Sequence, residues 1–297
     1  MSRMRSDEWA RCSPARGFTS TTVILPKRGR CEPVLKGGRP SSALALLALS
    51  TLICAAPASA VDVAVVKSWG EVPVFGELNS NWSAYGSVPL QIDTSLLKVP
   101  SFSYQDLVNT GADVLWLSDP AGGTMQYTPS EIDAIAQYVA EGHSILGTFC
   151  VFQWHEYDNR GLAPIFGLLA EIQYNTDIVV ADDSFEILDT NHPLFRDVPN
   201  PYVTGGYEHA QVPADDWSWD PGDLGSATLL ARTPDQRGII TWYETASYHA
   251  ILVSKMVEYE GNIDDTQFLY NALTIPSPGA LVLLGAAMLS CARRRRE

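Results

Sequence analysis

Residues 128–151 read TPSEIDAIAQYVAEGHSILGTFCV and predict a helix that leads directly into a strand. Thr128 is placed to cap the helix start, Pro129 suits the first helical position, and Glu131 completes a capping box with Thr128. Gly142 ends the helix and the apolar run Ser144–Val151 is typical of a buried strand. The apolar side chains at helical spacing, which should face the core, are Ile132, Ile135, Ala136 and Val139.

The same alternation of strands and helices continues on both sides of this stretch. Before it, the sequence predicts strands at Val61–Val66, Val88–Ile92 and Ala112–Ser118, and a short helix at Ser103–Asn109 that Gly111 ends. After it, we expect antiparallel strands at Ala227–Ala231, Gly238–Tyr243 and Tyr248–Ser254, and a last helix at Asp264–Leu273. Alternating β and α segments form parallel sheets with helices on both faces. The predicted fold is therefore α/β, a doubly wound and mainly parallel sheet with an added antiparallel segment.

The first 60 residues are typical of a secretory signal peptide. An apolar run at residues 43–56 follows Lys36 and Arg39, and it is too short to span a bilayer. Small residues come next, with Ala58 and Ala60 at the positions that a signal peptidase reads, so we expect cleavage after Ala60. The long stretch before the basic residues suggests that residues 1–33 result from an over-extended gene start. Lipidation of Cys54 is the alternative, although bulky Ile53 precedes it.

Residues 275–297 are expected to form a sorting tail. Pro276, Ser277 and Pro278 are followed by an apolar run at residues 279–292 and then by four arginines, Arg293, Arg294, Arg295 and Arg296. An apolar helix of this length rises about 21 Å, less than the roughly 30 Å of a hydrocarbon core. The arginines should stay on the cytoplasmic side. A C-terminal core helix is the alternative interpretation.

This tail resembles the PEP-CTERM sorting signal of exported bacterial proteins, which consists of a Pro-x-Pro motif, a short apolar helix and an arginine cluster. Ser277 replaces the central Glu of that family's motif. The resemblance implies a membrane sorting protease of the exosortase type as a partner, and a place in the cell envelope or outside the cell. We therefore divide the chain into a signal at 1–60, a domain at 61–274 and a tail at 275–297.

Removal of both ends makes the remaining chain strongly acidic. Residues 61–292 carry seven Lys or Arg and 30 Asp or Glu, a formal net charge of −23. Nucleic-acid binding depends on basic side chains that displace counterions, so nucleic acid is excluded as a partner. Solubility outside the cell explains the acidity, and a specific cation-binding role stays open. Cys150 would be the only thiol between the two ends, so no internal disulfide is expected there.

The domain at 61–274 resembles the class I glutamine amidotransferase-like superfamily, especially its trehalose-utilisation-protein-like branches. Four segments carry the resemblance: residues 112–119, residues 141–152 (EGHSILGTFCVF), residues 191–194 (NHPL), and residues 258–273 (EYEGNIDDTQFLYNAL). The resemblance implies a flavodoxin-like sheet whose site lies at the carboxyl ends of the strands.

Cys150 occupies about the place of that family's nucleophile. The flanking Thr148 and Phe152 stand where small residues are expected, and none of the five histidines has a Glu two residues later, as the family's partner motif requires. A reactive thiolate needs a base or a positive field, and the sequence assigns neither. A buried structural cysteine and a catalytic one are the two interpretations.

The residues after the fourth predicted strand are expected to lie at the rim of the crevice at the carboxyl ends of the strands. His155, Glu156 and Asp158, with Glu208 and His209, offer ligand types that zinc or manganese accepts, while a polar surface loop is the alternative. Aromatic rings could instead stack on sugars, although core packing also explains tryptophans; the candidates are Trp69, Trp82, Trp154, Trp217 and Trp219. The ligand-binding set that we predict is Trp69, Asp119, Trp154, His155, Glu156, Glu208 and His209.

Two functions remain open from the sequence. The first is an exported, envelope-sorted, amidotransferase-like domain without catalysis, which binds an extracellular ligand such as a polysaccharide. The second is a hydrolase that uses Cys150 or a metal near His155 at the same crevice. No cofactor is expected in either case.

Overall fold

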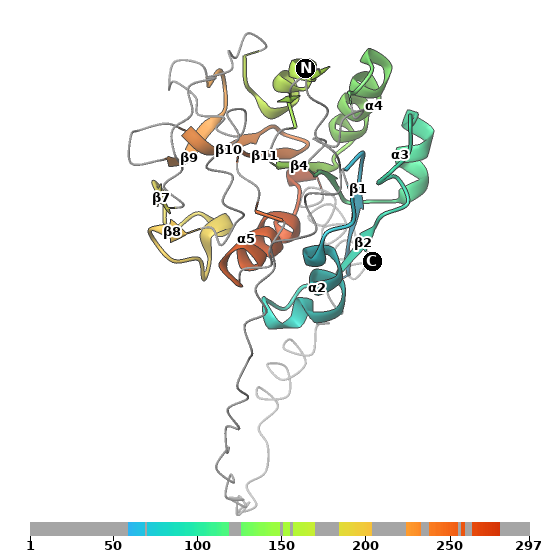
Figure 1. The fold of residues 1–297 in the computed structure, drawn as a ribbon. Helices are drawn as coiled ribbons and strands as arrows, with labels where there is room; N and C mark the ends of the chain where they lie inside the picture. Colours follow the sequence, from blue (N-terminus) through green and yellow to red (C-terminus); the bar gives the residue numbers. More distant parts are fainter. Residues whose placement is uncertain are drawn as a thin grey trace, which may run out of the picture. The chain divides into compact units, whose positions relative to one another are not determined.

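The computed structural model describes residues 59–68, 70–118, 126–148, 151–154, 157–169, 184–203, 224–232, 238–254, 257–258 and 263–279. For 153–154 and 157–158 it describes the backbone only. These residues form a mixed α/β domain around a nine-stranded sheet of order β2-β1-β3-β4-β11-β10-β9-β7-β8 (Figure 1). The predicted α/β class is therefore confirmed.

Five neighbouring strands of the sheet are parallel. They are β1 (Val61–Val65), β2 (Leu90–Asp93), β3 (Val114–Leu117), β4 (Ser144–Thr148) and β11 (His249–Val253). β1 leads to β2 on one side and the chain then returns to β3 on the other side of β1. This reversal is the topological switch point of a flavodoxin-like strand order, and it places the carboxyl ends of β1 and β3 beside each other.

The other half of the sheet is antiparallel. β10 (Gly238–Glu244) pairs with β11 and β9 (Thr228–Arg232), and β7 (Ser184–Ile187) joins β9 to the short β8 (Tyr202–Val203). A separate hairpin pairs β5 (Gln153–Trp154) with β6 (Tyr157–Asp158). The sheet is thus mixed, with five parallel strands and a larger antiparallel part than predicted, because β7 and β8 were not expected. β11, expected in the antiparallel set, is also parallel to β4.

Two helices confirm the capping signals in the sequence. Ser103 caps α3 (Tyr104–Thr110) and Gly111 ends it with φ of 65°. Thr128 caps α4 (Pro129–Ala140) through a complete capping box with Glu131. The buried face of α4 is displaced from the predicted one, because Ala134 and Tyr138 are buried whereas Ile132 and Ala136 are only half-buried. The Tyr138 hydroxyl donates to the carbonyl of Ala112, which holds this side of the helix on the sheet.

Helices cover both faces of the sheet and create two apolar cores. One core packs the sheet against α2 (Pro73–Asn81), which the sequence analysis missed, and α5 (Ile263–Thr274). The other packs the sheet against α3, α4 and the 3-10 helix η3 (Arg160–Phe166).

The predicted strands were longer than the observed ones by a few residues. For example, β4 ends at Thr148 and not at Val151.

The start of β1 and the end of the described chain lie at the amino edge of the parallel strands. Gly279 donates its N–H to the carbonyl of Ser247 in the turn just before β11, at 3.1 Å. Of the expected sorting tail, Pro276 is exposed and Pro278 half-buried, while Arg293 to Arg296 lie outside the described residues, as does Ala58 of the cleavage signal. Among the described helices, none has the length and hydropathy needed to cross a membrane.

Candidate functional site

Three strands and the segment after β11 bring polar side chains to one edge of the sheet. β1 leads to Lys67 and Ser68, β3 leads to Ser118, and β4 ends at Thr148. Open α/β sheets bind ligands outside the carboxyl ends of their strands, at the switch point. The candidate site is therefore the carboxyl edge around β1, β3 and β4, and two buried networks of polar contacts occupy it.

Lys67 is the first unusual residue at this edge. Its φ is 47°, in the left-handed region that side chains other than Gly rarely adopt, and its side chain is 2% exposed. Left-handed backbone costs about 1–2 kcal/mol for a residue with a Cβ. The backbone N–H of Lys67 donates to the carbonyl of Leu96, which fixes this turn. Strain of this kind concentrates at functional sites and persists only where the surroundings hold it.

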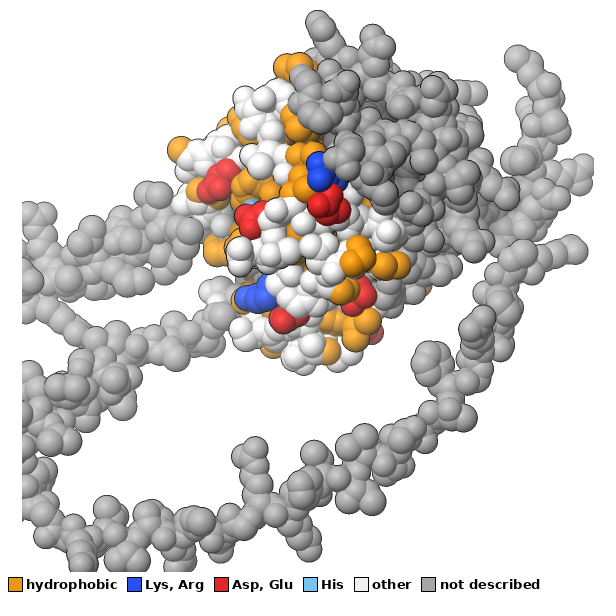
Figure 2. All heavy atoms as spheres, turned by 90° about the vertical axis from the view of Figure 1, so that its left-hand side faces the viewer, with side chains coloured by type: hydrophobic (Ala, Val, Ile, Leu, Met, Phe, Trp, Pro, Cys, Tyr) orange, Lys and Arg blue, Asp and Glu red, His pale blue; other side chains and the backbone are white. Residues whose placement is uncertain are grey.

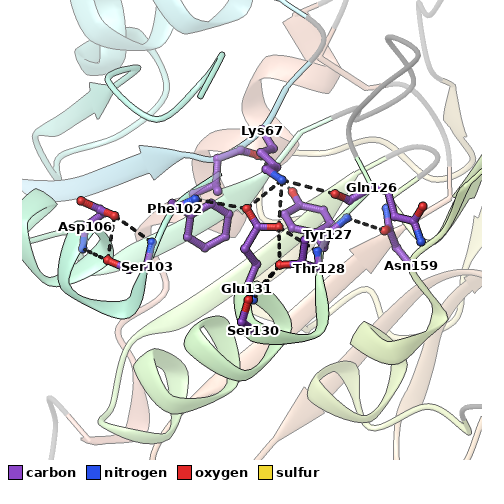
Figure 3. A network of polar contacts seen from close by, with 11 residues as sticks. Lys67, Phe102, Ser103, Asp106, Gln126, Tyr127, Thr128, Ser130, Glu131 and Asn159 are labelled. Atoms are coloured by element: carbon purple, nitrogen blue, oxygen red, sulfur yellow. Dashed lines mark hydrogen bonds and ion pairs between the residues drawn. The ribbon is translucent and has the colours of Figure 1, made fainter. Parts of the chain in front are cut away.

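Glu131 holds the buried ammonium of Lys67 (Figure 3). The Lys67 Nζ atom lies 2.7 Å from Glu131 Oε1 and 2.9 Å from Oε2, and it also donates to the Gln126 carbonyl at 3.3 Å. The rings of Phe102 and Tyr127 lie 5.8 and 5.5 Å from Nζ, within the range of cation–π attraction. The ammonium thus donates to a carboxylate and a backbone carbonyl inside the protein.

The Glu131 carboxylate is satisfied from several sides. Besides Lys67, it accepts hydrogen bonds from the backbone N–H of Phe102 at 3.1 Å and of Thr128 at 2.7 Å, and from the Thr128 hydroxyl at 3.0 Å. Burial raises the pKa of Glu131, but the bonds from Lys67 and Thr128 outweigh burial, so the pKa lies below its usual value. Burial, and then the charge of Glu131, raise the pKa of the Tyr127 hydroxyl.

Asn159 extends the network of Lys67 and Glu131 to the segment that follows β4. Its side-chain oxygen accepts from the N–H of Tyr127 at 2.8 Å (Figure 3). Its amide donates to the carbonyl of Val151 at 3.1 Å. Asn159 is fully buried. The start of α4 and the segment after β4 are therefore joined through one amide.

Glu258 organises a second network, at the carboxyl ends of β3 and β4. Its Oε1 atom accepts from the Ser118 hydroxyl at 3.1 Å and from the Thr148 hydroxyl at 2.5 Å, and all three side chains are buried. The Trp116 indole N–H donates to the Thr148 oxygen at 3.1 Å. This buried carboxylate links the ends of two strands to the segment after β11.

Most of the predicted site residues lie outside the described residues. They are Trp69, Asp119, Cys150, His155, Glu156, Glu208 and His209, and for Trp154 only the backbone, in β5, is described. These predictions stay untested. Trp82 is a correction: it begins the 3-10 helix η2 (Trp82–Ala84) on the amino side of β2 and packs against the core, so it is not at the crevice.

The histidines of the described residues lie away from the carboxyl edge. His143 stacks on Tyr138 just before β4, and His249 begins β11, where its Nδ1 lies 3.1 Å from the Ser144 hydroxyl. His192 caps the 3-10 helix η4 (Pro193–Phe195) and contacts Trp242. Ser144 and Thr148 lie about 13 Å apart along β4, so His249, which contacts Ser144, is at the opposite end of the strand from the site. Within the described ranges, no group of three or more His, Cys, Asp or Glu is arranged to hold a metal ion.

His249 is a buried histidine at the amino edge. Its ring stacks on Trp242 at 4.6 Å between centroids, and its Nε2 atom has no hydrogen-bond partner. Burial, and next the neighbouring His192, lower the pKa of His249 to about 4. The side chain is therefore neutral in the folded protein near pH 7.

No protein-family model matches the chain, and no curated protein matches it. Among solved structures, a protein described as a GMP synthase subunit from Thermoplasma acidophilum is 15% identical, with a TM-score of 0.43, covering 72% of this chain and 92% of that one. ThuA-like proteins from Bacteroides uniformis and Parabacteroides merdae are 15% and 8% identical, both with TM-scores of 0.42. They cover 74% and 72% of this chain, and 93% and 89% of their own. Likeness at this level assigns no activity.

We expect the loss of either partner of the buried ion pair to destabilise the domain. K67M leaves a buried carboxylate without its cation and E131Q leaves a buried ammonium, so each should lower the free energy of unfolding by about 3 kcal/mol. The double variant K67M/E131M should recover much of this loss. Urea unfolding measures it, and D133N, at an exposed position of the same helix, is the control. A loss in K67M no larger than in D133N would contradict the prediction.

We expect His249 to make the domain less stable in mild acid. The unfolded chain binds a proton at His249 below about pH 6.5, whereas the folded chain does not until about pH 4. Stability should therefore fall as the pH drops through this window, by about 3 kcal/mol in total. Urea unfolding between about pH 7 and pH 5 should show this slope, and H249Q should reduce it. An unchanged slope in H249Q would refute this assignment.

Proposed function

We propose that the chain is an exported, envelope-sorted protein whose amidotransferase-like α/β domain binds an extracellular ligand without turning it over. The site that we propose is the carboxyl edge of the parallel strands, and the ligand is an uncharged polymer such as a polysaccharide. The sorting tail would present the domain at the cell surface.

One observation carries this proposal: the charged side chains described at the carboxyl edge are engaged with internal partners. Glu131 neutralises Lys67, and Glu258 binds the hydroxyls of Ser118 and Thr148. Lys67 therefore offers no uncompensated positive charge at this edge, and a reactive thiolate needs a base or a positive field. The histidines in the described part of the chain lie at the amino ends of the strands or elsewhere, away from the carboxyl edge. These arrangements favour a rigid binding edge over a reactive one.

The charge of the domain supports a neutral ligand. The net charge of −23 over residues 61–292 repels anionic polymers. On the face shown in Figure 2, the described side chains form a mixture of apolar, polar and acidic groups with few basic ones. Sugars are recognised through hydroxyl groups and stacking on aromatic rings, so the predicted Trp69 and Trp154, with Asp119, are the residues that we assign to this ligand.

A second function is favoured by the position of Glu258. This carboxylate is buried at the carboxyl ends of β3 and β4, and Cys150 follows β4 by two residues in the sequence. A hydrolase that uses Cys150, or a metal held near His155, would need its general acid at this edge, where Glu258 lies. The alternative is therefore a Cys- or metal-dependent hydrolase at the same site.

We expect a ligand-binding experiment to separate the two functions. Titration calorimetry against neutral polysaccharides should detect binding, and W69A and W154A should each weaken it at least about tenfold, which corresponds to 1.4 kcal/mol. W82A is the control, because Trp82 lies on the amino side of β2. Iodoacetamide should leave Cys150 of the native protein unlabelled. Rapid labelling, with polysaccharide cleavage that C150S abolishes, would establish the hydrolase instead.

Export and sorting make a separate prediction about the two ends of the chain. Signal peptidase would cut after Ala60 and an exosortase-type protease would act near Pro276 to Pro278. Mass spectrometry of the protein from its natural envelope fraction should therefore find a chain that begins at Val61 and has lost its arginine cluster. Recovery of the uncut chain from the cytosol would contradict export while leaving the binding experiment valid.

A further inference from the structure

β2 is the last strand at one side of the sheet, and its outer edge faces away from β1. Val61 donates its N–H to the carbonyl of Pro89, so Pro89 faces β1. Backbone direction alternates along a strand, so Val88, Leu90 and Ile92 present their N–H and C=O groups outward. An open row of such groups is a template for pairing with another strand.

Asn79 of α2 occupies the outward groups of Ile92. The N–H of Ile92 donates to Asn79 Oδ1 at 2.6 Å, and Asn79 Nδ2 donates back to the Ile92 carbonyl at 3.3 Å. A side-chain amide carries the same donor and acceptor as a peptide group. Asn79 therefore substitutes for one residue of a neighbouring strand.

Tyr270 of α5 does the same at Val88. The N–H of Val88 donates to the Tyr270 hydroxyl at 2.8 Å, and that hydroxyl donates to the Val88 carbonyl at 3.0 Å. Gly86 makes this approach feasible, because a Cβ at Gly86 would overlap the Tyr270 ring. The two helices of one layer thus each supply a side chain to the same edge.

The other end of the sheet uses a similar contact. Asn200 Oδ1 accepts from the N–H of Ile187 at 3.2 Å, and Asn200 Nδ2 donates to the Ile187 carbonyl at 3.4 Å. Ile187 ends β7 at a point that β8 does not reach. An asparagine amide therefore completes a strand ladder at both ends of the sheet.

We infer that Asn79 and Tyr270 keep β2 from pairing with the β2 strand of a second copy of this chain. The outward residues 88, 90 and 92 are symmetric about Leu90. An antiparallel pair of two copies would set Val88 opposite Ile92 twice and Leu90 opposite Leu90 on the two-fold axis. Such a self-complementary contact is what a two-fold dimer requires. Both outer positions of this pairing are occupied from within the chain.

Each Ile92 would pair with Val88 of the second copy, so the double variant N79A/Y270F tests this inference by removing the side-chain bonds to both residues. Light scattering on the purified protein should give twice the molar mass of the native chain, and the amides of residues 88–93 should exchange more slowly in the assembled form. N81A/Y270F is the matched control, because the Asn81 side chain on the same helix donates to Glu77 and its loss leaves Asn79 on Ile92. N81A/Y270F should keep the native mass. A folded N79A/Y270F chain that keeps the native mass would overturn the inference.

A charge on the edge distinguishes strand pairing from unfolding. Gln91 is exposed on β2, and Lys at this position of both copies would place like charges on paired strands. N79A/Y270F/Q91K should therefore return to the native mass, and assembly that Q91K does not reverse would refute pairing through β2. If N79A/Y270F does not fold, N79S/Y270F keeps a short polar side chain at residue 79 and should show the same assembly with the same rescue. Native mass in folded N79S/Y270F would then count against the inference.

Discussion

A lysine can lie inside this domain only because a carboxylate meets it there. Lys67 follows β1 in a left-handed conformation, and Glu131 in the first turn of α4 neutralises it. The bonds that Glu131 accepts from Phe102 and Thr128 tie the loop before α3 and the start of α4 to the end of β1. The switch point, where such sheets place their ligands, is therefore built around one desolvated ion pair whose removal would loosen three segments together.

The sequence predicted the parallel half of the sheet better than the antiparallel half. Capping boxes and glycine stops are local signals, so the start of α4 at Thr128 and the end of α3 at Gly111 were predicted correctly. α2 was missed because its cap residue, Val72, makes no side-chain cap. The parallel pairing of β11 with β4 depends on contacts about 100 residues apart in the chain, which periodicity does not encode.

The site was less predictable than the fold. Glu131 was identified as a cap, but its pairing with Lys67 joins residues 64 positions apart, and no local pattern signals it. A lone lysine directly after an apolar strand, in a domain with seven basic residues, was the one available sign. No sign in the sequence pointed to the second network, which joins Glu258 to Ser118 and Thr148. A Ser or Thr at a strand end is ordinary until the fold brings a carboxylate to it.

The contact between Gly279 and Ser247 has a consequence for how the domain can be attached. It fixes the end of the described chain beside the start of β11, on the side of the sheet where β1 also begins. Tethering through either terminus would therefore hold the domain by its base and leave the opposite rim, with Lys67 and Glu258, turned toward the surroundings.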